Sequence, residues 1–193
     1  MNHSYLFLAP GFEEIEAIAT VDVLRRAGMN VTTVAVCDGS SLSVKGAHGV
    51  TVEADILVED ADFSDAEWLI CPGGMPGATN LASSPAVSAA LTTHFKKGGN
   101  IAAICASPAV VLEPLGILAG REATCYPGME GLIRDAKMHD TPVVALDSLI
   151  TGNGPASTLR FALAIVRASK GESVAQEVGG GMLFYPRSMN FYF

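Results

Sequence analysis

The sequence lacks the features that mark several large classes of protein. Its four cysteines stand far apart, with no Cys-x-x-Cys pair and no Cys/His cluster at metal-ligand spacing, so neither a metal site nor a disulfide scaffold is indicated. Lysine and arginine number 12 against 20 acidic residues and form no basic patch, which argues against a nucleic-acid partner. No apolar run approaches the length of a membrane-spanning helix, so we expect no membrane association.

The composition of the 193 residues favours one compact domain covering residues 1–193, because 49% are hydrophobic and only 17% are charged. The first residues carry no basic segment and only a short apolar run, unlike a secretory signal. We therefore expect a cytoplasmic location with reduced thiols.

Apolar segments alternate with amphipathic ones along the chain. Strands are predicted at residues 4–9, 31–37, 67–71 and 100–104, with later short strands near 122–125, 143–145 and 148–151. Helices are predicted at residues 13–26, 85–97 and 158–167, and a hairpin-like excursion at 43–53. This alternation predicts an α/β fold with a doubly wound, mostly parallel sheet sandwiched by helices. Sites in such sheets form outside the carboxyl ends of the strands.

The segment Asn100–Pro108 carries the most informative cysteine. A short apolar strand leads into Cys105, small residues flank it, and Pro108 suits the first turn of a helix. This pattern predicts a nucleophile elbow with strained backbone angles, where helix N-terminal N–H groups favour a thiolate and leave the sulfur partly accessible. On these grounds Cys105 should ionise below the ordinary thiol pKa of about 8.5. The local pattern equally fits a small buried hydrophobic residue at a strand end.

The C-terminal part of the chain is unusual in composition. Gly179-Gly180-Gly181 is the one flexible segment that the sequence indicates, and it lies within an aromatic tail, residues 178–193. The tail is too apolar to be left in solvent, so we expect it to pack on the body or on a neighbouring subunit.

Several motifs in one order make the chain resemble the ThiJ/PfpI superfamily, in the branch of the parkinsonism-associated deglycase and the YajL-like proteins. The matching motifs are Gly11-Phe12-Glu13-Glu14-Ile15-Glu16, Val23-Leu24-Arg25-Arg26-Ala27-Gly28, Pro72-Gly73-Gly74-Met75-Pro76-Gly77-Ala78, Ala102-Ala103-Ile104-Cys105-Ala106 and Gly154-Pro155-Ala156-Ser157-Thr158. The resemblance covers nearly the whole chain. It implies a flavodoxin-like fold, a homodimer and a reactive Cys105 beside a protonated Glu16.

Glu16 also has a physical argument of its own, because a carboxyl group near a thiolate in a closed site has a raised pKa and can donate a proton. Glu13 is expected to be a solvated, dipole-favoured residue at the helix start, and the role of Glu14 is left open. The resemblance further implies an oxyanion hole formed by the backbone N–H groups of Gly74 and Ala106, with Gly73 beside them.

Two residues depart from the family pattern. Tyr126 stands where the human family member has histidine, so a Cys–His pair is not implied, and we place Tyr126 among the binding residues. His48 stands where relatives carry arginine in the dimer-facing excursion. It either lines the site across an interface or is an exposed loop histidine.

Three functions remain in competition. The first is a cofactor-independent glyoxalase or deglycase acting on a small dicarbonyl or glycated protein, in which the Cys105 thiolate adds to an aldehyde and Glu16 moves the proton. The second is a redox sensor or chaperone that uses oxidation of Cys105. The third, thiazole monophosphate biosynthesis, finds no phosphate-cradling motif to support it.

Overall fold

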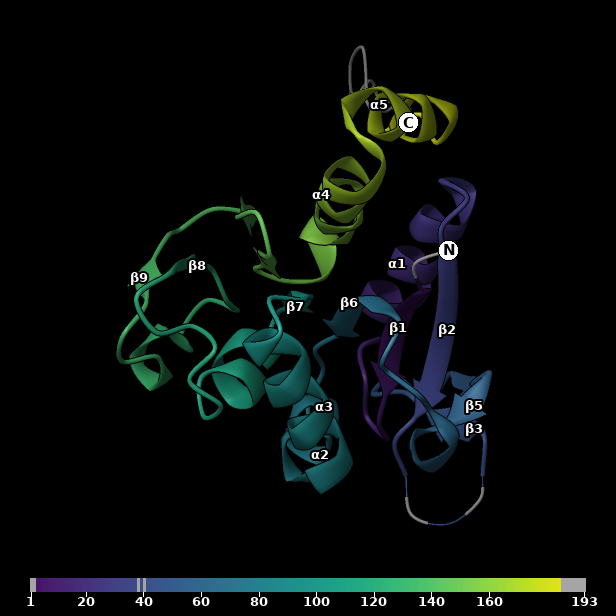
Figure 1. Cartoon of the computed structure of the whole chain (residues 1–193), viewed down its shortest axis with the longest axis vertical. Coiled ribbons are helices and arrows are strands. Elements are labelled where there is room, and N and C mark those ends of the chain that lie inside the picture. Colours follow the sequence, from purple (N-terminus) through teal and green to yellow (C-terminus); the bar gives the residue numbers. More distant parts are fainter. Residues whose placement is uncertain (1–2, 38, 40, 185–193) are drawn as a thin grey trace, which may run out of the picture.

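A computed structural model describes residues 3–37, 39 and 41–184 (Figure 1). At its centre lies a seven-stranded sheet in which every strand is parallel to its neighbours except β10. In spatial order the strands are β10 (Val143–Ala145), β11 (Leu149–Gly152), β7 (Asn100–Ile104), β6 (Ala66–Cys71), β1 (His3–Leu8), β2 (Asn30–Ala35) and β5 (Ile56–Leu57). The doubly wound, flavodoxin-like sheet expected from the sequence is confirmed.

Two smaller pairs of strands lie outside the main sheet. The antiparallel pair β3 (Ser43–Lys45) and β4 (Thr51–Glu53) confirms the predicted hairpin-like excursion. The pair β8 (Glu122–Ala123) and β9 (Lys137–Met138) is parallel. The first pair supplies the loop that reaches the site described below.

The helices form two groups. The helices of the first group contact one another in series; they are α1 (Glu14–Arg26), α4 (Thr158–Lys170) and α5 (Glu172–Gly181). The second group consists of α2 (Gly77–Ser83), α3 (Pro85–Lys96) and the short π-helical turn Pro108–Leu112. Figure 1 shows α4 and α5 together, well separated from α2 and α3. None of the helices in the described ranges has the length and apolar character needed to cross a membrane.

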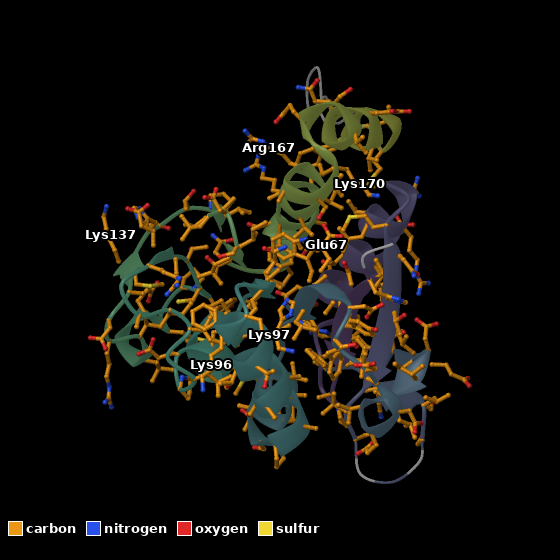
Figure 2. All side chains as sticks on the ribbon, viewed as in Figure 1. Glu67, Lys96, Lys97, Lys137, Arg167 and Lys170 are labelled. Atoms are coloured by element: carbon orange, nitrogen blue, oxygen red, sulfur yellow. The ribbon has the colours of Figure 1, made fainter. Side chains whose placement is uncertain are left out.

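Local sequence explains how the helices begin and end. Glu13 caps α1, since its side chain accepts a hydrogen bond from the Glu16 N–H at 2.8 Å, and Arg25 and Arg26 occupy the last turn. Arg167 of α4 pairs with Glu172 of α5 at 2.7 Å, at the end of α4 where Figure 2 shows Arg167 and Lys170. This ion pair lies across the one-residue junction between the two helices.

Two helices were not predicted from the sequence. The segment after Pro76 forms α2, and the glycines 179–181, which we expected to be flexible, form the last turn of α5. Gly179 is buried there, so a small residue allows α5 to pack closely, and packing outweighs the poor helix propensity of glycine. The aromatic tail beyond Phe184 lies outside the described residues.

The carboxyl ends of the parallel strands meet at one edge of the sheet. There Gly11, beyond β1, donates its N–H to the Lys45 carbonyl at 2.8 Å. Cys105, beyond β7, donates its N–H to the Gly152 carbonyl of β11 at 2.9 Å. This is the edge at which doubly wound sheets form their sites.

Candidate active site

Cys105 occupies the elbow directly after β7. Its φ of +63° lies in the left-handed region, which costs a residue other than glycine about 1–3 kcal/mol. Hydrogen bonds hold this conformation on both sides, because the Cys105 carbonyl accepts the N–H of Tyr126 at 2.8 Å while its N–H reaches Gly152. The strained elbow predicted from the sequence is confirmed.

The surroundings of the thiol differ from expectation in two respects. Cys105 is 7% exposed as a whole residue, so it is more deeply buried than the sequence pattern indicated. The helical segment that follows is a five-residue π-helical turn, too short to supply a substantial dipole. The donors to the sulfur are instead individual backbone N–H groups, those of Gly74 and Ala106. The family resemblance implied the same two N–H groups, as an oxyanion hole.

Glu16 lies beside this thiol with its side chain fully buried. Its Oε2 accepts the Gly73 N–H at 2.7 Å, and its carboxyl interacts electrostatically with Cys105. Its Oε1 has no hydrogen-bond partner among the described residues, which leaves one oxygen available to hold a proton. The first turn of α1 therefore presents a carboxyl group to the elbow, as the sequence predicted.

Gly73 is the point at which the thiol and the carboxyl meet. A Cβ atom at this position would lie 2.5 Å from Cys105 Cβ, 2.7 Å from Glu16 Oε2 and 3.0 Å from Cys105 Sγ. No side chain fits between them. Gly74, with φ +89°, lies equally close to the backbone at the start of α1. The two glycines thus let β6 approach both partners.

Cys105 and Glu16 compete for one proton. Burial raises the pKa of Glu16 to about 7, against the opposing effects of the Gly73 N–H and Cys105. Burial also raises the pKa of the Cys105 thiol to about 12, and a Glu16 carboxylate adds to this, while the N–H groups of Gly74 and Ala106 lower it. These two N–H donors are thus not enough for the low thiol pKa expected from the sequence. A low thiol pKa requires Glu16 to keep its proton.

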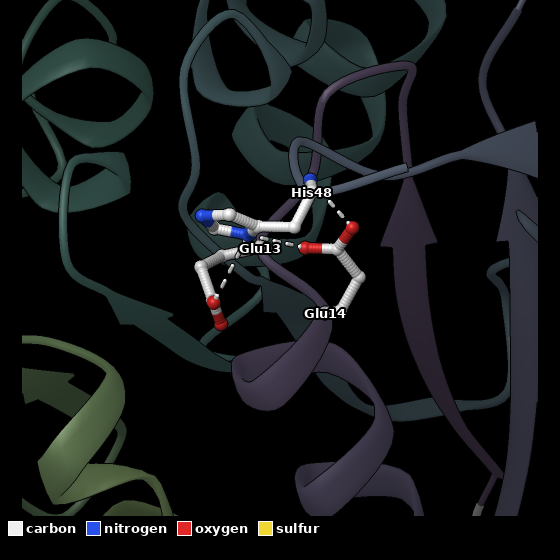
Figure 3. Close-up of side chains that lie close together, drawn as sticks. All are labelled: Glu13, Glu14 and His48. Atoms are coloured by element: carbon white, nitrogen blue, oxygen red, sulfur yellow. Dashed lines mark hydrogen bonds and ion pairs between the residues drawn. The ribbon is translucent and has the colours of Figure 1, made fainter. Parts of the chain in front are cut away.

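A second cluster borders the site and consists of Glu13, Glu14 and His48 (Figure 3). His48 Nδ1 lies 2.8 Å from Glu14 Oε2 and 3.8 Å from Glu13 Oε1, and the His48 N–H donates to Glu14 Oε1 at 2.7 Å. Both carboxylates are buried, whereas the His48 side chain is 72% exposed. Glu13 is therefore not the solvated residue expected from the sequence. Its carboxyl accepts the Glu16 N–H and lies near His48, and both contacts hold it in a buried position. His48 reaches the site within its own chain.

The protonation of this cluster follows from its hydrogen bonds. Burial acts to raise the pKa of Glu14, but hydrogen bonds from the His48 side chain and from backbone N–H groups outweigh it and lower the pKa. The hydrogen bond to Glu14 raises the pKa of His48. The donor atoms lie within 4.8 Å of one another, a spacing that a metal ion requires. Both oxygens of Glu14 already accept hydrogen bonds from His48, and Oε2 of Glu13 caps α1. We therefore interpret the cluster as a Glu14–His48 ion pair with Glu13 beside it, and not as a metal site.

The remaining residues of the site have supporting positions. Tyr126 is tied to the elbow by its backbone, while its ring is 47% exposed and lies against Gly154. Ser107 was missed in the sequence. Its hydroxyl donates to the Pro72 carbonyl at 2.5 Å and fastens the end of β6 to the elbow. The sequence offered only its position, directly after the small residues of the elbow, and the structure shows that Ser107 is fully buried there.

Comparison with known proteins assigns the family. The profile of the DJ-1/PfpI family matches residues 3–168, most of the chain. The chain belongs to the DJ-1/PfpI family. Among solved structures, oxidized Toxoplasma gondii DJ-1 is similar to it with a TM-score of 0.91 and 35% identity, over 95% of this chain and 98% of that one. The resemblance drawn from the motifs is thereby confirmed.

Relatives of this DJ-1/PfpI chain differ in length and in their names. Arabidopsis thaliana protein DJ-1 homolog B is 40% identical over 159 residues, which are 82% of this chain and 36% of that protein. The chain spans 44% of a second Arabidopsis relative, DJ-1 homolog A, and thus less than half of either. A Caenorhabditis elegans relative of similar length, 38% identical over 82% of this chain and 83% of its own, is named glutathione-independent glyoxalase DJR-1.2.

Proposed function

We propose that the protein is a cofactor-independent glyoxalase or deglycase that acts on small dicarbonyls, or on glycated protein, through Cys105 and Glu16. The observation that carries the proposal is the contact of a buried thiol and a buried carboxyl around Gly73, with the pKa of Glu16 raised by burial to about 7. A group with this pKa both gives and takes a proton near neutral pH. The name of the nematode relative supports the same reaction.

The proposed reaction on methylglyoxal needs no outside oxidant. The Cys105 thiolate forms a bond to the aldehyde carbon, and the carbonyl electron pair takes a proton to give a hemithioacetal. Glu16, now a carboxylate, removes the proton from that carbon and returns it to the neighbouring carbon. The hydroxyl proton of the hemithioacetal moves to the oxygen of the neighbouring carbon at the same time, which leaves a thioester of lactate. Water then cleaves the thioester and restores the thiol. The N–H groups of Gly74 and Ala106 stabilise the negative charge that develops at the elbow.

A redox sensor with a chaperone role is the second candidate, because the same two N–H groups would hold the oxygens of an oxidised Cys105. The proposal also includes a single domain over residues 1–193, a cytoplasmic location and a homodimer. Exposed apolar side chains on α1 and at the β3–β4 hairpin, Ile15, Ile18 and Val50, support the homodimer. Light scattering at micromolar concentration tests it, and a monomeric mass would refute it.

The enzyme and the sensor are separated by one experiment. Purified protein is incubated with methylglyoxal in the absence of glutathione, and lactate is measured for the wild type, Cys105→Ser and Glu16→Gln. We expect both variants to lose roughly 10³-fold or more of the turnover, because residues that act as a unit each remove most of the rate. Absence of wild-type turnover, with peroxide oxidising Cys105 selectively, would support the sensor instead.

A further inference from the structure

The charges around the reactive thiol are unevenly distributed. Three carboxyl groups, those of Glu13, Glu14 and Glu16, lie buried within one turn of α1. In the described part of the chain His48 is the only cationic side chain that pairs with any of them. His48 is also the exposed member of the cluster, and its imidazole lies beside the two buried carboxyl groups (Figure 3).

The glycines that border the sulfur also contact the backbone of this cluster. Gly73 is in contact with Cys105 and Glu16, and its carbonyl accepts the Glu13 N–H at 2.9 Å. The next residue, Gly74, donates an N–H to the sulfur and lies against the backbone of Glu13. Two consecutive glycines therefore lie between the thiol and the backbone of Glu13, and the Glu13 carboxyl acts electrostatically on Glu16, the carboxyl beside the sulfur. A reagent bound at Sγ lies in the field of the same carboxyl groups.

We propose that Glu13 and Glu14 make Cys105 select neutral carbonyl compounds over compounds that carry a carboxylate, and that His48 sets the strength of this selection. The inference rests on the proposed function only in taking an aldehyde as the natural ligand of Cys105. The hydrogen bond to Glu14 raises the pKa of His48, and loss of the His48 proton adds one negative charge to the cluster. Discrimination against anions therefore increases as the pH rises.

The charged and titratable groups at this position come from three elements. Glu13 and Glu14 of α1 face His48 directly, and Glu16 and Cys105 lie behind them. On the hairpin, Lys45 lies near Gly49, and its side chain forms no ion pair with Glu13 or Glu14. Glu16 gains negative charge in the same pH range, so a test must separate its effect from that of His48.

Alkylation of Cys105 provides that test without requiring turnover. Iodoacetamide and iodoacetate react with a thiolate by the same displacement of iodide, but only iodoacetate carries a carboxylate. The rate of alkylation of Cys105 by iodoacetamide is divided by its rate with iodoacetate, both measured by mass spectrometry from pH 5.5 to 8.5. This ratio is then divided by the same ratio for 2-mercaptoethanol, and the result is called the quotient. We expect a wild-type quotient above one that rises with pH, by on the order of five-fold for one added charge.

Three variants assign the effect to its residues. His48→Gln removes the cation, so the quotient is already high at pH 5.5, and the pH dependence that remains belongs to Glu16. His48→Arg fixes the positive charge and lowers the quotient at pH 8.5, and Glu13→Gln lowers it at every pH. The matched control is His3→Arg, which adds the same charge at the opposite edge of the sheet and leaves the quotient unchanged.

A wild-type quotient of one, or an equal change in His48→Arg and His3→Arg, would overturn the inference. The two proposals fail in different ways. If the wild type forms no lactate but has a quotient above one, the proposed enzyme activity is refuted and the charge selection stands. If the wild type forms lactate but has a quotient of one, the charge selection is refuted and the enzyme activity stands.

Discussion

Two buried cysteines on neighbouring strands have the same raised pKa for different reasons. Cys71 ends β6, pairs in register with Ala103, is fully buried and has a pKa of about 12 that is caused by burial alone. Cys105 follows β7 and also has a pKa of about 12, but Glu16 contributes to it and two N–H groups oppose it. Protonation of Glu16 removes one of these causes. Burial is the largest cause at both thiols, and what distinguishes Cys105 from Cys71 is the set of neighbours that act on its pKa.

Glu16→Gln, which changes the surroundings of Cys105 and not those of Cys71, should have the largest effect on the free energy of unfolding. The folded pKa of Glu16, about 7, lies above its ordinary value of 4.5, so the folded state keeps a proton that the unfolded chain releases. The stability of the wild type consequently falls as the pH rises from about 4.5 to about 7, by about 3 kcal/mol. Glu16→Gln should remove this loss, so that the variant is the more stable protein at pH 8.

Urea unfolding of both proteins at pH 4.5 and pH 8 measures the difference. Glu177→Gln, at an exposed carboxyl on α5, is the matched control and should show the same pH dependence as the wild type. An equal pH dependence in wild type and Glu16→Gln would mean that Glu16 is not a buried acid, and the contrast with Cys71 would disappear.

Gly73→Ala should separate the thiol from its carboxyl partner. The added Cβ would overlap Cys105 and Glu16, so we expect turnover to fall roughly 10²-fold, the scale associated with a displacement of about 1 Å in a catalytic group. Gly131→Ala is the control, because no atom lies within 4 Å of its Cβ position. Steady-state lactate formation measures both variants, and full activity in Gly73→Ala would show that the contact is dispensable.

A smaller effect tests the backbone at each cysteine. At Cys105 the positive φ favours glycine, so Cys105→Gly should be more stable than Cys105→Ala by about 1 kcal/mol. At Cys71, within a regular strand, the order should reverse, with alanine the more stable by about 1 kcal/mol. Thermal unfolding of the four variants measures this, and the same order at both positions would contradict a strained elbow.

The sequence predicted the parts of this molecule that depend on local pattern. The strand before Cys105 and the small residues around it indicated the elbow, whereas its carboxyl partner Glu16 was identified through the resemblance to the family. It did not predict the burial of Glu13, because that depends on His48, which arrives from a hairpin 34 residues further along than Glu14. Nor did it predict the helical state of Gly179–Gly181, which depends on packing against α4.

The burial of the thiol could not be predicted from local sequence pattern either, because it depends on a contact between segments that are far apart in the chain. Gly73 lies against Cys105, and Ser107 donates a hydrogen bond to the Pro72 carbonyl beside it, contacts that no spacing in the sequence encodes. Burial then becomes the largest influence on both pKa values, where the sequence suggested a helix dipole.

The pH profile of Cys105 alkylation by iodoacetamide, compared between wild type and Glu16→Gln, tests the shared proton most directly. If the pair releases its first proton near pH 7 and part of that form is the thiolate, the wild-type rate rises with an apparent pKa of about 7. Without the carboxyl, burial keeps the thiol protonated, and the midpoint moves above the ordinary value of about 8.5. Cys71 should stay unlabelled in both proteins. Identical midpoints in the two proteins, or a wild-type midpoint as high as the Cys71 pKa of about 12, would contradict a proton shared between Cys105 and Glu16.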